Sequence, residues 1–266
     1  MHVICPVCRE KLFVCGGSYK CSNAHCFDIA KEGYVNLLRA NKAGENIGDN
    51  RSMALCRRDV LSKGYYAALS NALCKLIPQH KVHGELLDIC CGEGYYTACM
   101  AEALSDFDIS GFDISREMVR LAAKRKCRAG FFVANMTDIP AENQQYDVLT
   151  HLFAPFAAEE FARVLKDDGV LFSVVSGEKH LWELKKVLYD TPYFNDEAPP
   201  PADSFTLVDT IKIKDTITLK SNEDIMALLK MTPYYYHTPT KGLERLSALD
   251  TLNTTVEFVI FVYKKG

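Results

Sequence analysis

Short apolar runs alternate with stretches of helical periodicity between residues 86 and 175, and this alternation constrains the fold more than any other feature. The apolar runs predict strands over residues 86–90, 109–112, 131–134, 146–153 and 169–175. Helices are predicted between them, over residues 95–104, 116–126 and 157–165. Repeated strand–helix units connected in a right-handed sense form a parallel sheet with helices on both faces. The sequence therefore predicts an α/β fold with a doubly wound, mostly parallel sheet.

The N-terminal segment is rich in cysteine. Five of the 11 cysteines lie in the first 26 residues: Cys5, Cys8, Cys15, Cys21 and Cys26. The pattern Cys5-x2-Cys8-x12-Cys21-x3-His25 has the ligand types and short pair spacings of a structural zinc site. A bound ion stabilises a segment that is too small to build a core of its own. Cys26 adjoins His25 and Cys15 lies nearby, so the residues alone leave the fourth ligand open.

Three regions follow from these patterns: a zinc-binding module over residues 1–38, a linker and helical segment over 39–78, and a larger domain over 79–266. Residues 39–52 are polar with no apolar period, whereas residues 53–77 have helical spacing that Pro78 ends. Towards the C-terminus, strands are predicted over 205–219 and 256–263, with a helix that begins after Ser221.

The loop at residues 88–94 joins the first strand of the larger domain to a helix. The loop lies at the carboxyl end of that strand, and ligands of open α/β sheets bind in the crevice outside the carboxyl ends of the strands. Gly92 and Gly94 let the backbone approach a ligand closely, and the helix N-terminus offers free N–H groups. Asp113 ends the second strand, where a carboxylate can accept hydrogen bonds from both hydroxyls of a ribose. Together these features predict an adenosine-type ligand bound with the help of Asp88, Gly92, Gly94 and Asp113.

Two details indicate which adenosine ligand binds. A dinucleotide fingerprint needs a third glycine, but Thr97 occupies that position. Glu93 lies where a pyrophosphate would approach and would repel it, although its charge tolerates a sulfonium ligand that bears an amino group. S-adenosylmethionine is therefore the predicted cofactor.

The stretch 88–97 resembles the first motif of class I methyltransferases and, more narrowly, that of RlmA-type 23S rRNA (guanine-N1-)-methyltransferases. Residues 27–38 are similar to the stretch that follows the zinc ligands in that family. The resemblance implies a class I methyltransferase domain with a small N-terminal zinc module that grips ribosomal RNA. It further implies one structural Zn²⁺, transfer from S-adenosylmethionine to N1 of a guanine in a 23S rRNA hairpin, and a homodimer.

The resemblance also marks individual residues. It selects Cys5, Cys8, Cys21 and His25 as the zinc ligands and adds Tyr66, Glu93 and His180 to the cofactor contacts.

Three positions depart from the family pattern. His151 and Phe153 replace an arginine and a tyrosine at the end of the fourth strand, which leaves His151 a weak candidate for the proton acceptor. Cys90 stands where the family has glycine, and the turn survives there if its backbone is not left-handed. The aromatic residues within 231–236 are interpreted equally as core or as a stacking surface for an extruded base.

Composition excludes some classes of protein. No run of eighteen apolar residues and no signal peptide is present, so a cytoplasmic protein with no membrane partner is expected. A net charge of -3 does not indicate a general nucleic-acid coat protein, and the basic run at 124–128 is interpreted as a solvated helix end. Two alternatives stay open. One is a methyltransferase of small molecules in which the zinc module only stabilises a lid, and the other is a non-catalytic zinc RNA-binding protein, which Cys90 alone favours.

Overall fold

The computed structural model describes residues 1–39 and 51–266. Most of the predicted linker at 39–52 lies outside the described residues. The N-terminal segment contains the short strands β1 (Phe13–Cys15), β2 (Ser18–Lys20), β3 (Cys26–Asp28) and β4 (Val35–Asn36). The helical segment predicted over 53–77 is two helices, α1 (Arg51–Ser62) and α2 (Ala67–His80). Pro78 lies inside the last turn of α2 instead of ending it.

The larger domain begins with the predicted alternation of strands and helices. Its elements are β5 (Gly84–Ile89), α3 (Tyr95–Ala103), β6 (Phe107–Asp113), α4 (Arg116–Ala123), β7 (Gly130–Val133), β8 (Tyr146–Leu152), α5 (Ala158–Val164) and β9 (Leu165–Ser176). The remaining elements are α6 (Trp182–Leu188), β10 (Phe205–Leu219), α7 (Asn222–Lys230), the 3-10 helix η2 (Pro233–His237), α8 (Thr240–Ser247) and β11 (Leu252–Lys265). Ser221 caps α7 as expected, because its hydroxyl accepts a hydrogen bond from the Asp224 N–H.

One eight-stranded sheet organises the molecule, in the order β10-β11-β9-β8-β5-β6-β7-β4. The pairs formed by β5 with β6 and β8, β6 with β7, and β8 with β9 are parallel, whereas β11 is antiparallel to both β9 and β10. The predicted doubly wound, mostly parallel sheet is confirmed. Because the strand order reverses beside β5, a crevice opens at the carboxyl end of that strand.

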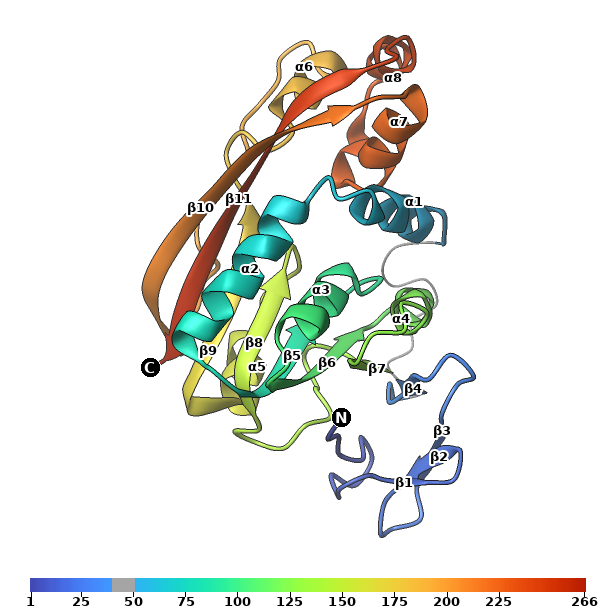
Figure 1. The fold of residues 1–266 in the computed structure, drawn as a ribbon, viewed down its shortest axis with the longest axis vertical. Coiled ribbons are helices and arrows are strands. Elements are labelled where there is room, and N and C mark those ends of the chain that lie inside the picture. The colour runs from blue at the N-terminus through green and yellow to red at the C-terminus, as the bar shows by residue number, and fades with distance from the viewer. Residues whose placement is uncertain (40–50) are drawn as a thin grey trace.

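Apolar side chains of the sheet pack into two cores, one on each face. Leu86 packs with residues of α2, α3 and α6, whereas its neighbour Leu87 packs with Phe161 and Val164 of α5. Figure 1 shows α2 and α3 across the near face of the sheet and α5 behind it. Alternate residues of a buried strand face opposite sides of the sheet, which is why the successive residues Leu86 and Leu87 of β5 are both buried.

The N-terminal segment is continuous with the larger domain. Val35 and Asn36 of β4 pair in parallel with Phe132 and Val133 of β7, so the eighth strand of the main sheet comes from within residues 1–38. Strands β1, β2 and β3 form a separate antiparallel sheet, at the lower right of Figure 1. In the part of the chain that the structure describes, no helix is long and apolar enough to cross a bilayer.

Candidate functional site

The two glycines of the 88–94 loop have different tasks. Gly94 precedes α3 with φ +80, and a Cβ added there would lie 2.7 Å from the Ala122 Cβ, so glycine is needed for packing of the loop against α4. Gly92 also has a left-handed backbone, at φ +57, but an added Cβ would meet nothing within 4 Å. The space beside Gly92 is therefore open to a ligand. Cys90 has φ +56, so the expected condition of a backbone that is not left-handed is not met.

Asp88 is a structural carboxylate at the base of the loop. It is buried and accepts hydrogen bonds from the Thr97 hydroxyl at 2.5 Å and the Thr150 hydroxyl at 2.9 Å. These bonds tie the end of β5 to α3 and β8. Burial raises the pKa of Asp88 to about 6, because desolvation disfavours the charged carboxylate.

Asp113 organises the opposite side of the crevice. Its carboxylate accepts the Gly92 N–H at 3.0 Å and the Ser115 N–H at 2.8 Å. Ser115, and not Asp113, is the N-cap of α4, because the Ser115 hydroxyl accepts the Met118 N–H. Each carboxylate oxygen can accept more than one hydrogen bond, so these contacts are compatible with binding of ribose hydroxyls.

A cavity of about 300 Å³, here called the first cavity, lies between the loop and α1. Its lining includes Asp88, Gly92, Glu93 and Asp113, together with Cys90, Tyr96, Arg57 and residues 152–155. Two buried polar atoms of this lining have no hydrogen-bond partner among the described residues, namely the Glu93 Oε1 and the Tyr96 hydroxyl. A ligand that offers an amino group and an acceptor oxygen would satisfy both atoms. S-adenosylmethionine carries such groups, so the residues present fit this cofactor.

The charge of Glu93 is balanced within the protein, which the sequence reasoning did not foresee. Arg125 donates to the Glu93 Oε2 from Nε at 2.9 Å and also from Nη2, and the carboxylate side chain is only 1% exposed. Repulsion of a pyrophosphate is consequently weaker than the sequence suggested. The interpretation of residues 124–128 as a solvated helix end is wrong for Arg125 and also for Arg128, whose Nη2 donates to the Ala101 carbonyl at 2.7 Å.

Tyr66 and His180, which are 114 residues apart in the chain, meet in a second cavity of about 350 Å³. Arg57, Phe153 and Ala154 line both cavities. The His180 Nδ1 accepts the Glu257 N–H at 3.2 Å, which leaves the proton of the neutral ring on Nε2. Nε2 therefore donates to the Tyr66 hydroxyl oxygen at 3.1 Å. The hydroxyl proton of Tyr66 is then available to an acceptor in the second cavity.

Burial keeps His180 neutral, because desolvation lowers its pKa to about 3. Tyr66 and His180, two of the predicted cofactor contacts, are thus brought together, but in the second cavity and not beside Gly92.

His151 belongs to the core behind the sheet. It is buried, its Nε2 donates to the Pro155 carbonyl at 2.9 Å, and its Nδ1 lies 3.3 Å from the Ser173 hydroxyl. Burial lowers the pKa of His151 to about 4. Its ring packs against Phe156 and Phe161, and it is absent from the linings of both cavities. The suggestion that His151 accepts a proton stays a prediction without geometric support.

The aromatic residues within 231–236 divide between the two roles expected for them. Tyr234 lines the second cavity, and its hydroxyl donates to the Asn195 Oδ1 at 2.9 Å. The Nζ of the buried Lys185 donates to the same oxygen at 2.6 Å and lies 4.8 Å from the centre of the Tyr234 ring. Tyr235 and Tyr236 are exposed. One ring is therefore fixed in the wall of the second cavity, while the other two are exposed and the Tyr236 hydroxyl donates to the Met53 sulfur at 2.8 Å.

The predicted zinc ligands form one cluster. The Cys5, Cys8 and Cys21 Sγ atoms and the nearest His25 ring nitrogen all lie within 4.8 Å of one another. The Cys8 and Cys21 Sγ atoms are 3.6 Å apart, and His25 Nδ1 lies 3.4 Å from the Cys21 Sγ. Tetrahedral zinc with bonds of about 2.3 Å to sulfur separates its ligand atoms by roughly 3.8 Å, so the spacing fits one ion.

Cys15 and Cys26 are exposed and lie outside this cluster. The selection of Cys5, Cys8, Cys21 and His25 as the ligand set of a zinc site is thereby supported by position.

Two family models match the chain. Residues 3–43 match the model described as RlmA, N-terminal, a zinc ribbon, and residues 86–169 match a methyltransferase domain. Together with the strand order, the second match confirms the class I methyltransferase fold.

Three curated relatives cover much of the chain. A protein of Micromonospora griseorubida, provisionally named a 23S rRNA (guanine-N1-)-methyltransferase, is 30% identical over 93% of this chain and 92% of its own length. A protein of Bacillus subtilis (strain 168) with the same provisional name is 29% identical over 98% of this chain and 96% of its own. The 23S rRNA (guanine(748)-N(1))-methyltransferase of Streptomyces fradiae is 32% identical over 70% and 68%, respectively.

Proposed function

Because this chain belongs to the family of RlmA-type 23S rRNA (guanine-N1-)-methyltransferases, we propose that it methylates N1 of a guanine in a 23S rRNA hairpin. The methyl donor is S-adenosylmethionine. The observation that carries the proposal is the combination in one chain of a cluster with zinc-ligand geometry and the first cavity. The match to the RlmA zinc ribbon and the relatives named as 23S rRNA methyltransferases support RNA over a small molecule as the acceptor. The first cavity supports an enzyme over a non-catalytic RNA-binding protein.

Residues of the first cavity hold the cofactor in this proposal. Gly92 leaves room for the ligand, and Gly94 lets the loop pack against α4. Asp88 fixes the loop, and Asp113 accepts hydrogen bonds from the ribose hydroxyls. Glu93 accepts a hydrogen bond from the amino group of the cofactor through its unpartnered Oε1. The cofactor supplies an activated methyl group, so the protein's main task is alignment.

Tyr66 and His180 remain proposed contacts of the cofactor, at its amino-acid end. They line the second cavity, which adjoins the first because Arg57, Phe153 and Ala154 line both. The oriented Tyr66 hydroxyl supplies a donor suited to a carboxylate oxygen.

We propose that the second cavity admits the acceptor guanine. N1 lies on the Watson–Crick edge, so the base must be unpaired or turned out of a helix before it can react. During transfer the bond from N1 to the methyl carbon forms, the bond from that carbon to sulfur breaks, and N1 loses its proton. The products are 1-methylguanine, S-adenosylhomocysteine and a proton. Phe153 and Tyr234 offer aromatic rings in the lining where the base would enter.

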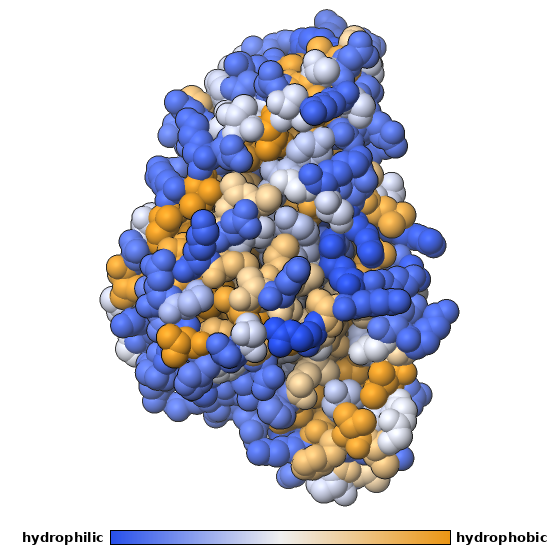
Figure 2. Space-filling view, viewed as in Figure 1, coloured by the Kyte–Doolittle hydropathy of each residue, from blue (hydrophilic) through white to orange (hydrophobic). Residues whose placement is uncertain are grey.

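The zinc module is proposed to grip the RNA. Phe13 and Val14 of β1 are 65% and 63% exposed, and Figure 2 shows apolar residues gathered over the lower right of the molecule, where this module lies. An exposed aromatic ring such as that of Phe13 can stack on an unpaired base. The proposed ribosomal RNA substrate supports a cytoplasmic location. The homodimer implied by the family resemblance stays a prediction, which light scattering coupled to gel filtration tests.

Transfer of a labelled methyl group tests the proposal. The protein is incubated with methyl-labelled S-adenosylmethionine and protein-free 23S rRNA, and the RNA is collected on filters. We expect label in the RNA with the native protein and at least a hundredfold less with Asp113→Ala. Absence of label in RNA, with binding of S-adenosylhomocysteine intact by calorimetry, would favour a small-molecule acceptor. Absence of binding would favour the non-catalytic alternative.

A further inference from the structure

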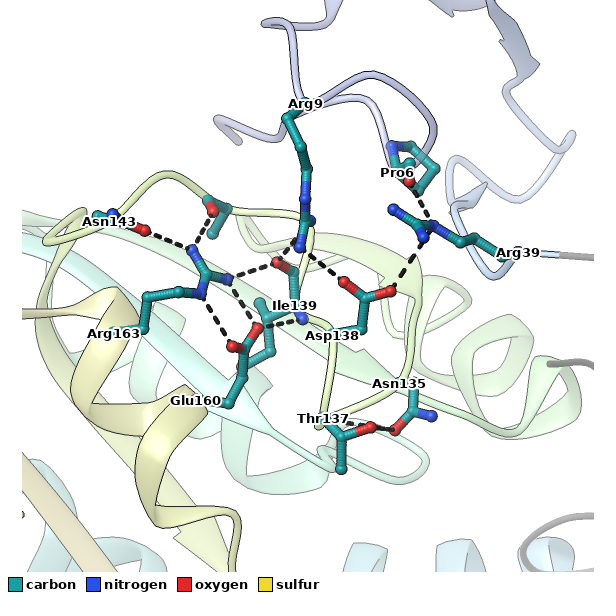
Figure 3. Close-up of polar contacts among 11 residues, drawn as sticks. Pro6, Arg9, Arg39, Asn135, Thr137, Asp138, Ile139, Asn143, Glu160 and Arg163 are labelled. Atoms are coloured by element: carbon teal, nitrogen blue, oxygen red, sulfur yellow. Dashed lines mark hydrogen bonds and ion pairs between the residues drawn. The ribbon is translucent and has the colours of Figure 1, made fainter.

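Arg9 connects the zinc cluster to the methyltransferase domain. It directly follows the ligand Cys8, has a left-handed backbone at φ 66, and donates its N–H to the Cys5 carbonyl at 2.9 Å. Its side chain leaves the zinc module, and Nη2 donates to the Asp138 Oδ1 at 2.7 Å. Figure 3 shows this side chain crossing between the two parts of the molecule. The conformation of the zinc-ligand turn therefore determines where the Arg9 guanidinium lies.

A second arginine holds the same carboxylate. The Arg39 Nε donates to the Pro6 carbonyl, inside the zinc-ligand turn, and lies 3.7 Å from the Asp138 Oδ2 (Figure 3). The Asp138 side chain is only 16% exposed. Nearby, the Ile4 N–H donates to the Pro140 carbonyl at 2.9 Å. Partly buried pairs of this kind are screened less by solvent than exposed ones, so they can fix position.

Asp138 belongs to the segment 134–141, here called the β7 loop, which α5 holds from the other side. Glu160 accepts the Ile139 N–H at 2.6 Å, and the Arg163 Nη2 donates to the Ile139 carbonyl at 2.9 Å (Figure 3). Ile139 and Ala141 are fully buried. The β7 loop is thus clamped between the zinc module and α5, and movement of the module would be transmitted to it.

The β7 loop also supports the lining of the first cavity, at two points. The Ala134 N–H donates to the Asp113 carbonyl at 3.2 Å. The Cys90 thiol lies 3.8 Å from the Met136 sulfur, in the geometry of a weak hydrogen bond. Asp113 and Cys90 both line the first cavity. A continuous set of contacts therefore runs from the zinc ligands through Asp138 to the cofactor loop.

We propose that Arg9 and Asp138 are positioning residues that couple the two sites, so that zinc binding and cofactor binding strengthen each other. This inference rests on the proposed function in naming the cofactor. Coupling between two sites is reciprocal, since each ligand must change the affinity for the other by the same factor. Neither residue touches the first cavity, so both act only through the β7 loop.

Calorimetry with S-adenosylhomocysteine tests the coupling in the full-length, zinc-loaded protein. We expect Arg9→Ala and Asp138→Asn each to weaken binding by about 5- to 10-fold, within the range typical of coupled sites. The double variant should weaken binding by less than the product of the two single effects, because Arg9 and Asp138 share one ion pair. Each residue also has a contact of its own, Arg9 with the Ile139 carbonyl and Asp138 with Arg39. Asp138→Asn alters only the methyltransferase side and leaves the zinc ligands untouched.

Lys11→Ala is the matched control. Lys11 lies in the same module and pairs with Glu142 near the same loop, but at 3.4 Å and with side chains 64% and 51% exposed. An exposed pair contributes little, so this variant should bind as the native protein does. The reciprocal measurement is zinc affinity in competition with a chelator. In the native protein, S-adenosylhomocysteine should raise the affinity for zinc by the factor by which zinc raises the affinity for S-adenosylhomocysteine. In Asp138→Asn the increase in zinc affinity should be smaller.

The outcomes separate this inference from the proposed function. If the native protein does not bind S-adenosylhomocysteine, the proposed function fails. If it binds and both variants bind equally well with zinc retained, the coupling is wrong. A raised KM for the cofactor at unchanged kcat in Asp138→Asn would support positioning, whereas a fall in the urea midpoint with unchanged affinity would indicate a structural role alone and overturn the proposal.

Discussion

Three acidic side chains lining one cavity have three different tasks. Asp88 is satisfied by two threonine hydroxyls, Asp113 by two backbone N–H groups, and Glu93 by Arg125 on one oxygen only. Residue type predicted that carboxylates would gather at this edge of the sheet. It could not predict which oxygen would be left for a ligand, because that depends on an arginine 32 residues away in the chain.

His151 provides a prediction about acid stability. Its pKa lies near 4 in the folded protein and near 6.5 when unfolded, so the unfolded chain binds more protons between these values. Stability is therefore lost as the pH falls below 6.5, by about 2 kcal/mol from this group at pH 5. His151→Gln should reduce the difference in unfolding free energy between pH 7.5 and pH 5 by that amount. Urea denaturation at both pH values measures it.

The same variant tests the catalytic suggestion. A residue that lines neither cavity can be replaced with little effect on chemistry, so kcat of His151→Gln at pH 7.5 should remain within about threefold of the native value. Removal of a general base costs roughly 10²–10⁴ in rate. A loss of that size in a variant that stays folded would restore His151 as the proton acceptor.

At the scale of elements, the turn from β5 into α3 depends on two glycines with separate demands. Gly94→Ala should lower the free energy of unfolding by roughly 1–3 kcal/mol, because its Cβ would overlap Ala122 and its φ is +80. Gly92→Ala should cost about 1 kcal/mol in stability but weaken S-adenosylhomocysteine binding about tenfold, because its Cβ would occupy open space in the cavity lining. Urea denaturation and calorimetry on both variants check this. The reverse ranking would contradict the assigned roles.

The zinc module gives a second prediction at this scale. Cys21→Ser removes a ligand from the cluster, so zinc content should fall well below one ion per chain and residues 1–34 should become sensitive to protease. Cys26→Ser is the matched control, since Cys26 is exposed and adjoins the ligand His25. It should retain one zinc ion and full protease resistance. Loss of zinc from Cys26→Ser would show that the ligand set is wrong.

Most elements of the larger domain could be predicted from the sequence, because buried parallel strands and amphipathic helices have local signatures. The strand predicted over 205–219 coincides with β10, and Ser221 caps the next helix as expected. Strand β4 was not predicted, because two residues carry no period and their pairing with β7 is a long-range choice. The helix α6 was also not predicted, because Trp182–Leu188 is short and lies outside the strand–helix alternation.

For the molecule as a whole, function depends on contacts that join distant parts of the chain. Tyr66 meets His180, and Arg9 meets Asp138 across 129 residues. Local patterns cannot reveal such pairs, so the sequence could not predict that the proposed contact residues divide between two cavities. The zinc module, the β7 loop and the cofactor loop are connected by hydrogen bonds, so the zinc module is part of the structure that supports the cofactor loop.

The proposed activity of the protein is methylation of guanine N1 in 23S rRNA. Mass spectrometry of nucleosides, with mapping of digested 23S rRNA, measures it directly in cells with and without the gene. We predict that one 1-methylguanosine in a 23S rRNA hairpin disappears when the gene is deleted and returns with the native gene but not with Asp113→Ala. An unchanged content of 1-methylguanosine at every position of the 23S rRNA would contradict the claim.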